Sequence, residues 1–133
     1  MAFQPIVDVT QRQVVYYEAL VRGINGESAF SILSQVTDEL MYRFDQACRV
    51  KAIELASELG MTERLSINFL PNAVYEPEAC IQSTLETSRR VDWPTERLNF
   101  EITETERVVD RAHMRSIIDS YRRMGFTTSL DDF

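Results

Sequence analysis

The chain has 133 residues, of which 44% are apolar, and a formal net charge of −7 from 21 acidic and 14 basic side chains. The length suits one ordinary domain, and this apolar content excludes a wholly disordered chain. The acidic balance argues against a DNA-binding protein, because non-specific affinity for phosphates needs a basic surface.

The two cysteines, Cys48 and Cys80, lie in no CxxC or Cys/His spacing, so the sequence predicts neither a zinc site nor a disulfide framework. Thiols that stay reduced are typical of a cytoplasmic protein. The opening residues MAFQPIVDV lack the basic and long apolar segments of a signal peptide. No apolar run approaches the ~20 residues of a membrane span, so we expect no membrane association.

Two strands are predicted at the start of the chain. FQPIVDV, residues 3–9, is typical of an edge strand, because Pro5 has no amide hydrogen to donate to a ladder. QVVYYEALVRG, residues 13–23, is rich in β-branched and aromatic residues and ends at a glycine. The short polar stretch at residues 10–13 predicts that these strands form an antiparallel hairpin.

A short helix over residues 29–36 and a long helix over about residues 38–59 are expected next. Thr37 stands at the cap position, and Asp38 opens the first turn, where the helix dipole favours acids. Gly60 suits the left-handed residue just past the end of the helix. Apolar residues at helical spacing predict its buried face: Leu40, Phe44, Ala47, Cys48, Leu55 and Leu59.

The rest of the chain alternates strand and helix. RLSINFL, residues 64–70, and LNFEITE, residues 98–104, have the apolar character of buried strands. Helices are expected over residues 78–90 and from about residue 108 to Gly125, and TTSLDDF, residues 127–133, is the last strand. The predicted order is β-β-α-α-β-α-β-α-β, which favours an α/β fold with a parallel sheet and right-handed crossovers after the opening hairpin.

Each predicted strand after the first carries an oxygen-bearing side chain near its C-terminal end. In parallel α/β folds these ends line one site, so the side chains are expected to meet. A set of oxygen ligands without His or Cys favours Mg²⁺, Mn²⁺ or Ca²⁺. The alternative is that these acids cap loops and pair with the arginines of the chain. The residues concerned are Glu18, Asn68, Glu101, Asp131 and Asp132.

Five segments, taken in order, resemble the EAL domain family of cyclic di-GMP phosphodiesterases. The resemblance spans the whole chain, and it implies a modified TIM-type (β/α) barrel whose first two strands run antiparallel. This agrees with the predicted hairpin. The segments are FQPIVD (3–8), YEALVRG (17–23), SINFLPNAVYEP (66–77), NFEITETE (99–106) and LDDF (130–133).

The resemblance also implies a reaction and a set of residue roles. The reaction is metal-dependent hydrolysis of cyclic di-GMP to linear pGpG, with two Mg²⁺ or Mn²⁺ ions. Glu18 and Asp132 would be the catalytic residues, with Asp132 lying between the metals and helping to hold the attacking water. The metal ligands would be Glu18, Asn68, Glu101, Asp131 and Asp132; the substrate contacts would be Gln4, Leu20 and Arg22; and Glu104 would support the loop after its strand.

The length of the chain is short for this fold, since a TIM-type barrel takes ~250 residues. We therefore expect residues 1–133 to be a truncated EAL domain, the N-terminal half of the barrel with five strands and four helices. Such a half should bind metal weakly and hydrolyse cyclic di-GMP poorly or not at all. Its open edges favour a homo-oligomer or a domain-swapped dimer. The alternative function is a non-catalytic regulatory or protein-interaction module that acts as a dimer.

Overall fold

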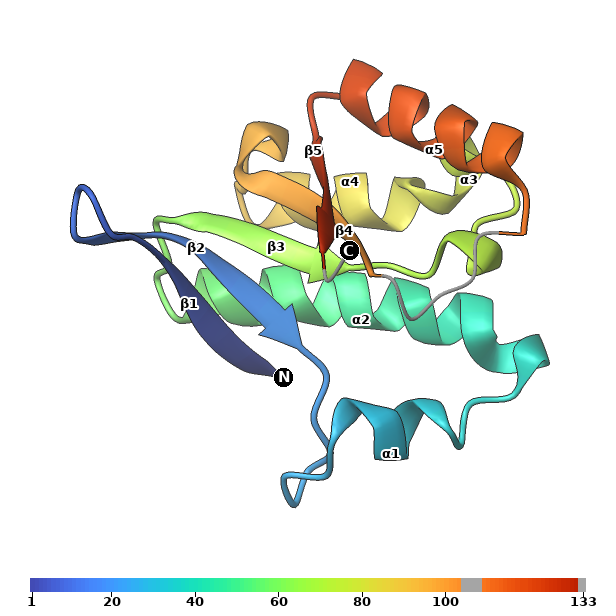
Figure 1. Cartoon of the computed structure of the whole chain (residues 1–133), viewed down its shortest axis with the longest axis horizontal. Coiled ribbons are helices and arrows are strands. Elements are labelled where there is room, and N and C mark those ends of the chain that lie inside the picture. Colours follow the sequence, from blue (N-terminus) through green and yellow to red (C-terminus); the bar gives the residue numbers. More distant parts are fainter. Residues whose placement is uncertain (104–108, 132–133) are drawn as a thin grey trace.

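The computed structural model describes residues 1–103 and 109–131, and it consists of one five-stranded sheet with helices packed against it (Figure 1). In the described residues no helix combines the length and apolar character needed to cross a membrane. The strands are β1 (Ala2–Asp8), β2 (Gln13–Leu20), β3 (Arg64–Asn68), β4 (Leu98–Thr103) and β5 (Thr127–Asp131). The helices are α1 (Ala29–Leu33), α2 (Asp38–Glu58), α3 (Pro77–Cys80), α4 (Gln82–Arg90) and α5 (Arg111–Arg123), with 3-10 turns η1 (Pro71–Ala73) and η2 (Thr95–Arg97).

The strands follow one another across the sheet in chain order. β1 pairs with β2 antiparallel, and each later pair is parallel, which confirms the predicted hairpin and parallel sheet. In this register Glu18 lies beside Ser66, Ser66 beside Asn99, and Asn99 beside Thr127. Side chains paired in this way point to the same face of the sheet, so these four form one row across it.

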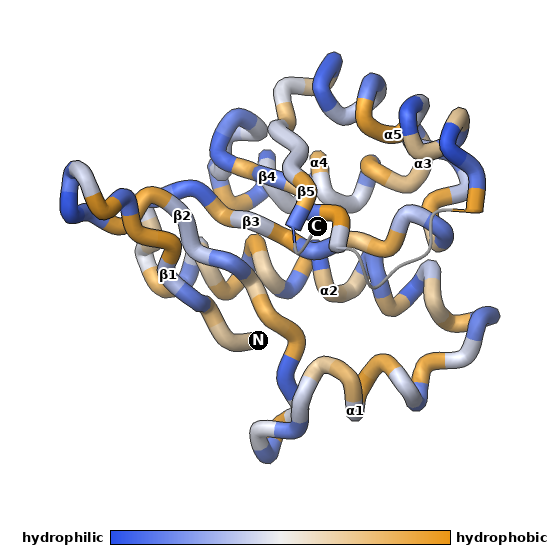
Figure 2. The backbone as a smooth tube through the Cα atoms, in the orientation of Figure 1, coloured by the Kyte–Doolittle hydropathy of each residue, from blue (hydrophilic) through white to orange (hydrophobic). Residues whose placement is uncertain are grey.

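The opposite face of the sheet is closed by helices. Leu65, Ile67 and Phe69 from β3 and its end, together with Leu98, Phe100 and Ile102 from β4, are almost wholly buried in one core with residues of α2 and α5. Figure 2 shows orange and blue alternating along α5, as expected of a helix with one side on the sheet. The helices therefore cover one face of the sheet. The side chains that alternate with these buried residues point to the other face, where they can form a site.

Phe100 lies at the centre of an aromatic cluster. Its ring centroid is 5.9 Å from that of Phe69, 4.9 Å from that of Tyr121 and 5.3 Å from that of Phe126. Such tilted and edge-to-face pairs contribute beyond the area that they bury. Phe100 therefore faces the helices while its neighbour Glu101 faces the other side, as the alternation predicts.

The predicted buried face of α2 was wrong. Leu40 is 51% exposed and Leu59 is 69% exposed, although both belonged to the predicted apolar stripe. The physical reason is that two charged residues of α2 belong to the core. A prediction based on the spacing of apolar residues does not count charged residues as buried. The residues of α2 that the structure buries are Asp45, Arg49, Ala52, Ile53 and Ala56.

Asp45 and Arg49 form an ion pair inside the core. Arg49 Nε lies 2.9 Å from Asp45 Oδ2, and Arg49 Nη1 donates to the Tyr121 hydroxyl at 2.7 Å. The guanidinium carbon is 5.0 Å from the Phe100 ring centroid, so the aromatic cluster also surrounds the charge. Asp45 Oδ1 accepts the Leu70 amide hydrogen at 3.0 Å. The pair thereby ties α2 to α5 and to the segment that follows β3.

Several predicted element boundaries also shift. The helix expected over residues 78–90 is divided into α3 and α4, with only Ile81 between them. α5 begins at Arg111 because the Asp110 side chain accepts the His113 amide hydrogen as an N-cap, so Val109, 80% exposed, precedes the helix. Thr37 occupies the cap position of α2 but makes no side-chain cap hydrogen bond.

Gly125 ends α5 in the left-handed region, at φ +94°, and a Cβ there would lie 2.8 Å from Thr95 Oγ1. Gly60 has a similar conformation, φ +67°, with no atom within 4 Å of its Cβ position. We expect Gly60→Ala to cost about 1 kcal/mol through the backbone alone, and Gly125→Ala to cost more. Urea unfolding of both variants measures the difference, and equal losses would mean that Thr95 moves aside.

Candidate metal centre

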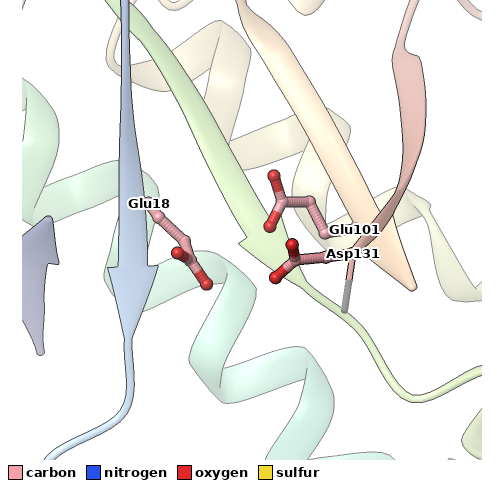
Figure 3. Close-up of side chains that lie close together, drawn as sticks. All are labelled: Glu18, Glu101 and Asp131. Atoms are coloured by element: carbon pink, nitrogen blue, oxygen red, sulfur yellow. The ribbon is translucent and has the colours of Figure 1, made fainter. Parts of the chain in front are cut away.

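Three carboxylates from separate strands converge at one edge of the sheet. Glu18 comes from β2, Glu101 from β4 and Asp131 from the end of β5, and Figure 3 shows them pointing toward one another. Each offers an oxygen atom, and the three oxygens lie within 4.8 Å of one another. The parallel strand order explains this convergence, because successive strands end at the same edge.

Asn68 completes the group from β3. Its Nδ2 donates to Glu18 Oε1 at 2.8 Å, which fixes the orientation of the amide. Its Oδ1 is buried, and no donor within the described ranges, 1–103 and 109–131, reaches it. A buried carbonyl oxygen without a partner costs about 1–3 kcal/mol, and a cation bound at this oxygen would remove that cost. Three carboxylates and one available amide oxygen fit a hard divalent cation.

The electrostatics of Glu101 also favour a cation. Only 8% of Glu101 is exposed. Burial raises the pKa of its carboxyl group, the charges of Glu18 and Asp131 raise this pKa further, and hydrogen bonds from Ser66 and Ser129 act in the opposite direction. A cation among these groups would compensate for both the burial and the repulsion.

We expect Glu101→Gln to stabilise the metal-free chain at pH 7 by about 1 kcal/mol. The substitution removes a buried charge that neighbouring carboxylates repel, and removing such a charge from a functional site commonly stabilises a protein. The raised pKa means that the charged form of Glu101 destabilises the fold as the pH rises through that pKa. The gain should therefore be present at pH 7 and disappear at acidic pH, where Glu101 is already neutral. Melting temperatures measured in EDTA across pH 4–8 test this; Glu58→Gln, at an exposed position of α2, is the control.

The predicted substrate contacts lie at different distances from this centre. Gln4 on β1 is exposed and pairs directly with Glu18, so the two share a face of the sheet. Leu20 ends β2 and follows Glu18 by two residues on that same face. Arg22 lies beyond the strand, exposed, and its Nη1 donates to the Val21 carbonyl at 2.7 Å. The structure thus brings Gln4 and Leu20 to this edge and leaves Arg22 outside the cluster.

Two further predicted residues, Asp132 and Glu104, lie outside the described residues. The roles predicted for them stay predictions.

An apolar cavity of about 210 Å³ opens beside the centre, between the ends of β2 and β3 and helix α2. Leu20 and Asn68 line it together with Phe44 and Cys48. Burial, with a smaller contribution from Asp45, raises the pKa of the Cys48 thiol to about 11. The thiol is therefore protonated at neutral pH, which argues against Cys48 as a ligand of the neighbouring centre.

Sequence reasoning missed a set of polar residues under the carboxylates. Asn99 is 5% exposed and Ser66 is 0% exposed, and both lie on the face that carries Glu101. Ser129 and Thr127 on β5 reach the same place through hydrogen bonds to Asn99. The two-residue alternation along the strand could have indicated Asn99, because it places Asn99 on the same face as Glu101. A single neutral amide in an apolar strand did not by itself indicate a functional role.

The comparisons with known proteins agree with this geometry. The family model described as the EAL domain matches residues 1–133, the full length of the chain. A standalone EAL protein from Vibrio cholerae O395, solved in its cyclic di-GMP-bound form, is 55% identical, with a TM-score of 0.94. That match covers 100% of this chain and 56% of the Vibrio chain.

Other relatives are less similar, and this chain covers a smaller share of their length. BlrP1 from Klebsiella pneumoniae, solved with cyclic di-GMP and calcium, is 27% identical, with a TM-score of 0.88 over 98% of this chain and 34% of BlrP1. A manganese complex of BlrP1 gives the same figures. The antirepressor BluF from Escherichia coli K12, regulated by blue light and temperature, is 28% identical over 99% of this chain and 33% of BluF.

The chain spans about half the length of the Vibrio protein and one third of the other two. The five-stranded sheet with its antiparallel first hairpin corresponds to part of the barrel-type domain of these proteins. The match of the family model to every residue decides the assignment: the chain belongs to the EAL domain family.

Proposed function

We propose that this chain carries the metal-binding part of a cyclic di-GMP phosphodiesterase site, and that residues 1–133 correspond to the N-terminal half of an EAL barrel. The observation that carries the proposal is the convergence of three carboxylates, one of which is bonded to the Asn68 amide, whose buried Oδ1 has no partner among the described residues. It is supported by relatives of the same family that were solved with cyclic di-GMP and with calcium or manganese.

In this proposal Glu18, Asn68, Glu101 and Asp131 hold a Mg²⁺ or Mn²⁺ ion. A bound divalent ion would activate water and neutralise charge on the phosphoryl oxygens of the substrate. The Asn68 amide holds the Glu18 carboxylate through its hydrogen bond, so Glu18 is oriented before any ion arrives. Asp132 is proposed to hold the attacking water beside a second ion.

The remaining residues bind and orient the substrate. Gln4 and Leu20 lie beside the centre. Leu20 also lines the neighbouring cavity and provides an apolar surface for the substrate. Arg22 must turn away from the Val21 carbonyl to contact a phosphate, which its exposed position allows. Glu104 is proposed to support the loop after β4.

A chimaera tests the proposal. Residues 1–133 are joined to the part of the Vibrio cholerae EAL protein that lies beyond the matched region, and conversion of cyclic di-GMP to pGpG is followed by chromatography with Mn²⁺ present. We expect turnover by the chimaera, and little or none by the 133 residues alone. A folded chimaera without turnover would contradict the proposal, and turnover by the 133 residues alone would show that the present chain suffices.

Glu18→Ala in the chimaera should abolish turnover, since it removes a ligand. Glu58→Ala, at an exposed position of α2, is the matched control and should leave turnover unchanged.

We also propose that the chain by itself associates with copies of itself. In the described part of the chain, β1 and β5 are the two edge strands of the sheet, and they carry exposed apolar side chains, Ile6 and Val7 on β1 and Leu130 on β5. Such edges favour strand pairing between chains. Light scattering should give a mass above that of one chain at micromolar concentration, whereas a stable monomer on dilution would contradict this.

A further inference from the structure

The metal centre rests on a buried polar row. Ser66, Asn99 and Thr127 lie side by side on adjacent strands in the same row as Glu18, and Glu101 and Ser129 follow two residues later on the same face. Asn99 is central in this row and almost wholly buried. A buried amide must satisfy its donors and acceptor within the protein, so its hydrogen bonds determine what it does.

The hydrogen bonds of Asn99 define its orientation. The Thr127 hydroxyl donates to Asn99 Oδ1 at 2.9 Å. With that oxygen fixed, Nδ2 donates to Ser66 Oγ and to Ser129 Oγ, each at 2.8 Å. Nδ2 has two hydrogens, and these two short bonds use both. The Glu101 oxygen, 3.5 Å from Nδ2, is therefore at most weakly bonded to Asn99 itself.

The Ser66 and Ser129 hydroxyls connect Asn99 to Glu101. A hydroxyl has a single hydrogen, and an oxygen that already accepts from Asn99 directs that hydrogen elsewhere. Ser129 is the direct partner of Glu101 in the β4–β5 register, and Ser66 lies on the same face of β3, two residues before Asn68, which is the partner of Glu101 there. The two hydroxyls therefore flank the Glu101 carboxylate from the two neighbouring strands, and interactions with both lower the pKa of that carboxyl group.

We propose that Asn99 is a positioning residue of the metal centre, which acts through the Ser66 and Ser129 hydroxyls to aim the Glu101 carboxylate at the cation. This inference rests on the metal centre of the proposed function. Partners of this kind typically change metal affinity by about 10- to 100-fold when they are removed. Asn99 does not touch the ion or the substrate in this arrangement.

The test is Mn²⁺ affinity of the full chain, measured by titration calorimetry and by the electron paramagnetic resonance signal of free Mn²⁺. Asn99→Leu, which is close in size and has no donor, should weaken binding about tenfold or more. Ser129→Ala should weaken binding in the same direction, and Ser129→Thr, which keeps a hydroxyl, should restore it. Thr128→Val, on the opposite face of β5, is the matched control.

A double variant separates positioning from general damage. If Asn99 acts through Ser129, adding Ser129→Ala to Asn99→Leu should cost less than the sum of the two single losses. Additive losses, or wild-type affinity in Asn99→Leu, would overturn the proposal. If Asn99→Leu does not fold, as judged by its melting curve, the Ser129→Ala and Ser129→Thr pair decides, and equal affinities in that pair overturn it. Absence of Mn²⁺ binding by the wild-type chain overturns the metal centre itself, and this inference with it.

Discussion

Replacing Arg49 with methionine is expected to destabilise the chain by about 3–5 kcal/mol, because it leaves the Asp45 carboxylate buried without its ion-pair partner. Burial already raises the pKa of Asp45, and Arg49 opposes that shift. Without Arg49, Asp45 should hold a proton more firmly in the folded chain than in the unfolded chain. The loss of stability should therefore be largest at neutral pH and shrink as the pH falls through the pKa of Asp45 in the folded variant. Urea unfolding at pH 7 and pH 5 measures both effects.

Two variants make this prediction specific. Asn at position 45 keeps an acceptor for the Leu70 amide and removes the charge, so Asp45→Asn combined with Arg49→Met should be more stable than Arg49→Met alone. Arg90 pairs with Glu54 at 2.6 Å, but its side chain is 59% exposed, so Arg90→Met should cost less than about 1 kcal/mol. Similar losses at positions 49 and 90 would show that burial of the pair is unimportant.

Glu18→Ala is expected to abolish the stabilisation of the chain by Mn²⁺. A ligand present at 100 times its dissociation constant stabilises a fold by about 2.7 kcal/mol, which is several degrees in melting temperature for a chain of this size. Glu18 supplies a carboxylate oxygen and also accepts the hydrogen bond that orients the Asn68 amide. This one substitution therefore disturbs two of the groups proposed to bind the cation. Melting curves with Mn²⁺ and with EDTA give the comparison.

The control for Glu18→Ala is Glu39→Ala, an exposed acid in the first turn of α2. It removes the same charge away from the centre and should leave the Mn²⁺-dependent shift intact. A shift retained by Glu18→Ala and lost by Glu39→Ala would place the cation elsewhere on the chain.

The predictable part of this fold was its order of strands and helices. Short apolar segments bounded by Gly and Pro locate strands well, and the alternation within a strand correctly placed Glu101 opposite Phe100. The strand ends then gave Glu18, Asn68, Glu101 and Asp131 as one group, because parallel topology brings those ends together. Local pattern and general topology were enough for this part of the site.

The buried face of α2 could not be predicted in the same way. Hydrophobic periodicity assumes that core residues are apolar, whereas Asp45 and Arg49 are buried because they satisfy each other, Tyr121 and the Leu70 amide. Two of these partners, Tyr121 and the Leu70 amide, are brought to the pair by packing between distant segments. Asn99 could not be predicted for a related reason, because its proposed role depends on its hydrogen bonds with two serines and a threonine from neighbouring strands. A residue that works through partners shows no signal of its own in a single sequence.

The antiparallel direction of β1 has a practical consequence for experiments on this chain. Because β1 runs against the other strands, its first residues lie at the edge where β2 to β5 end, and Met1 lines the cavity beside Asn68. A fluorophore on the terminal amine would thus report on cation binding directly, whereas a bulky N-terminal affinity tag would crowd the entrance and should be cleaved before any titration.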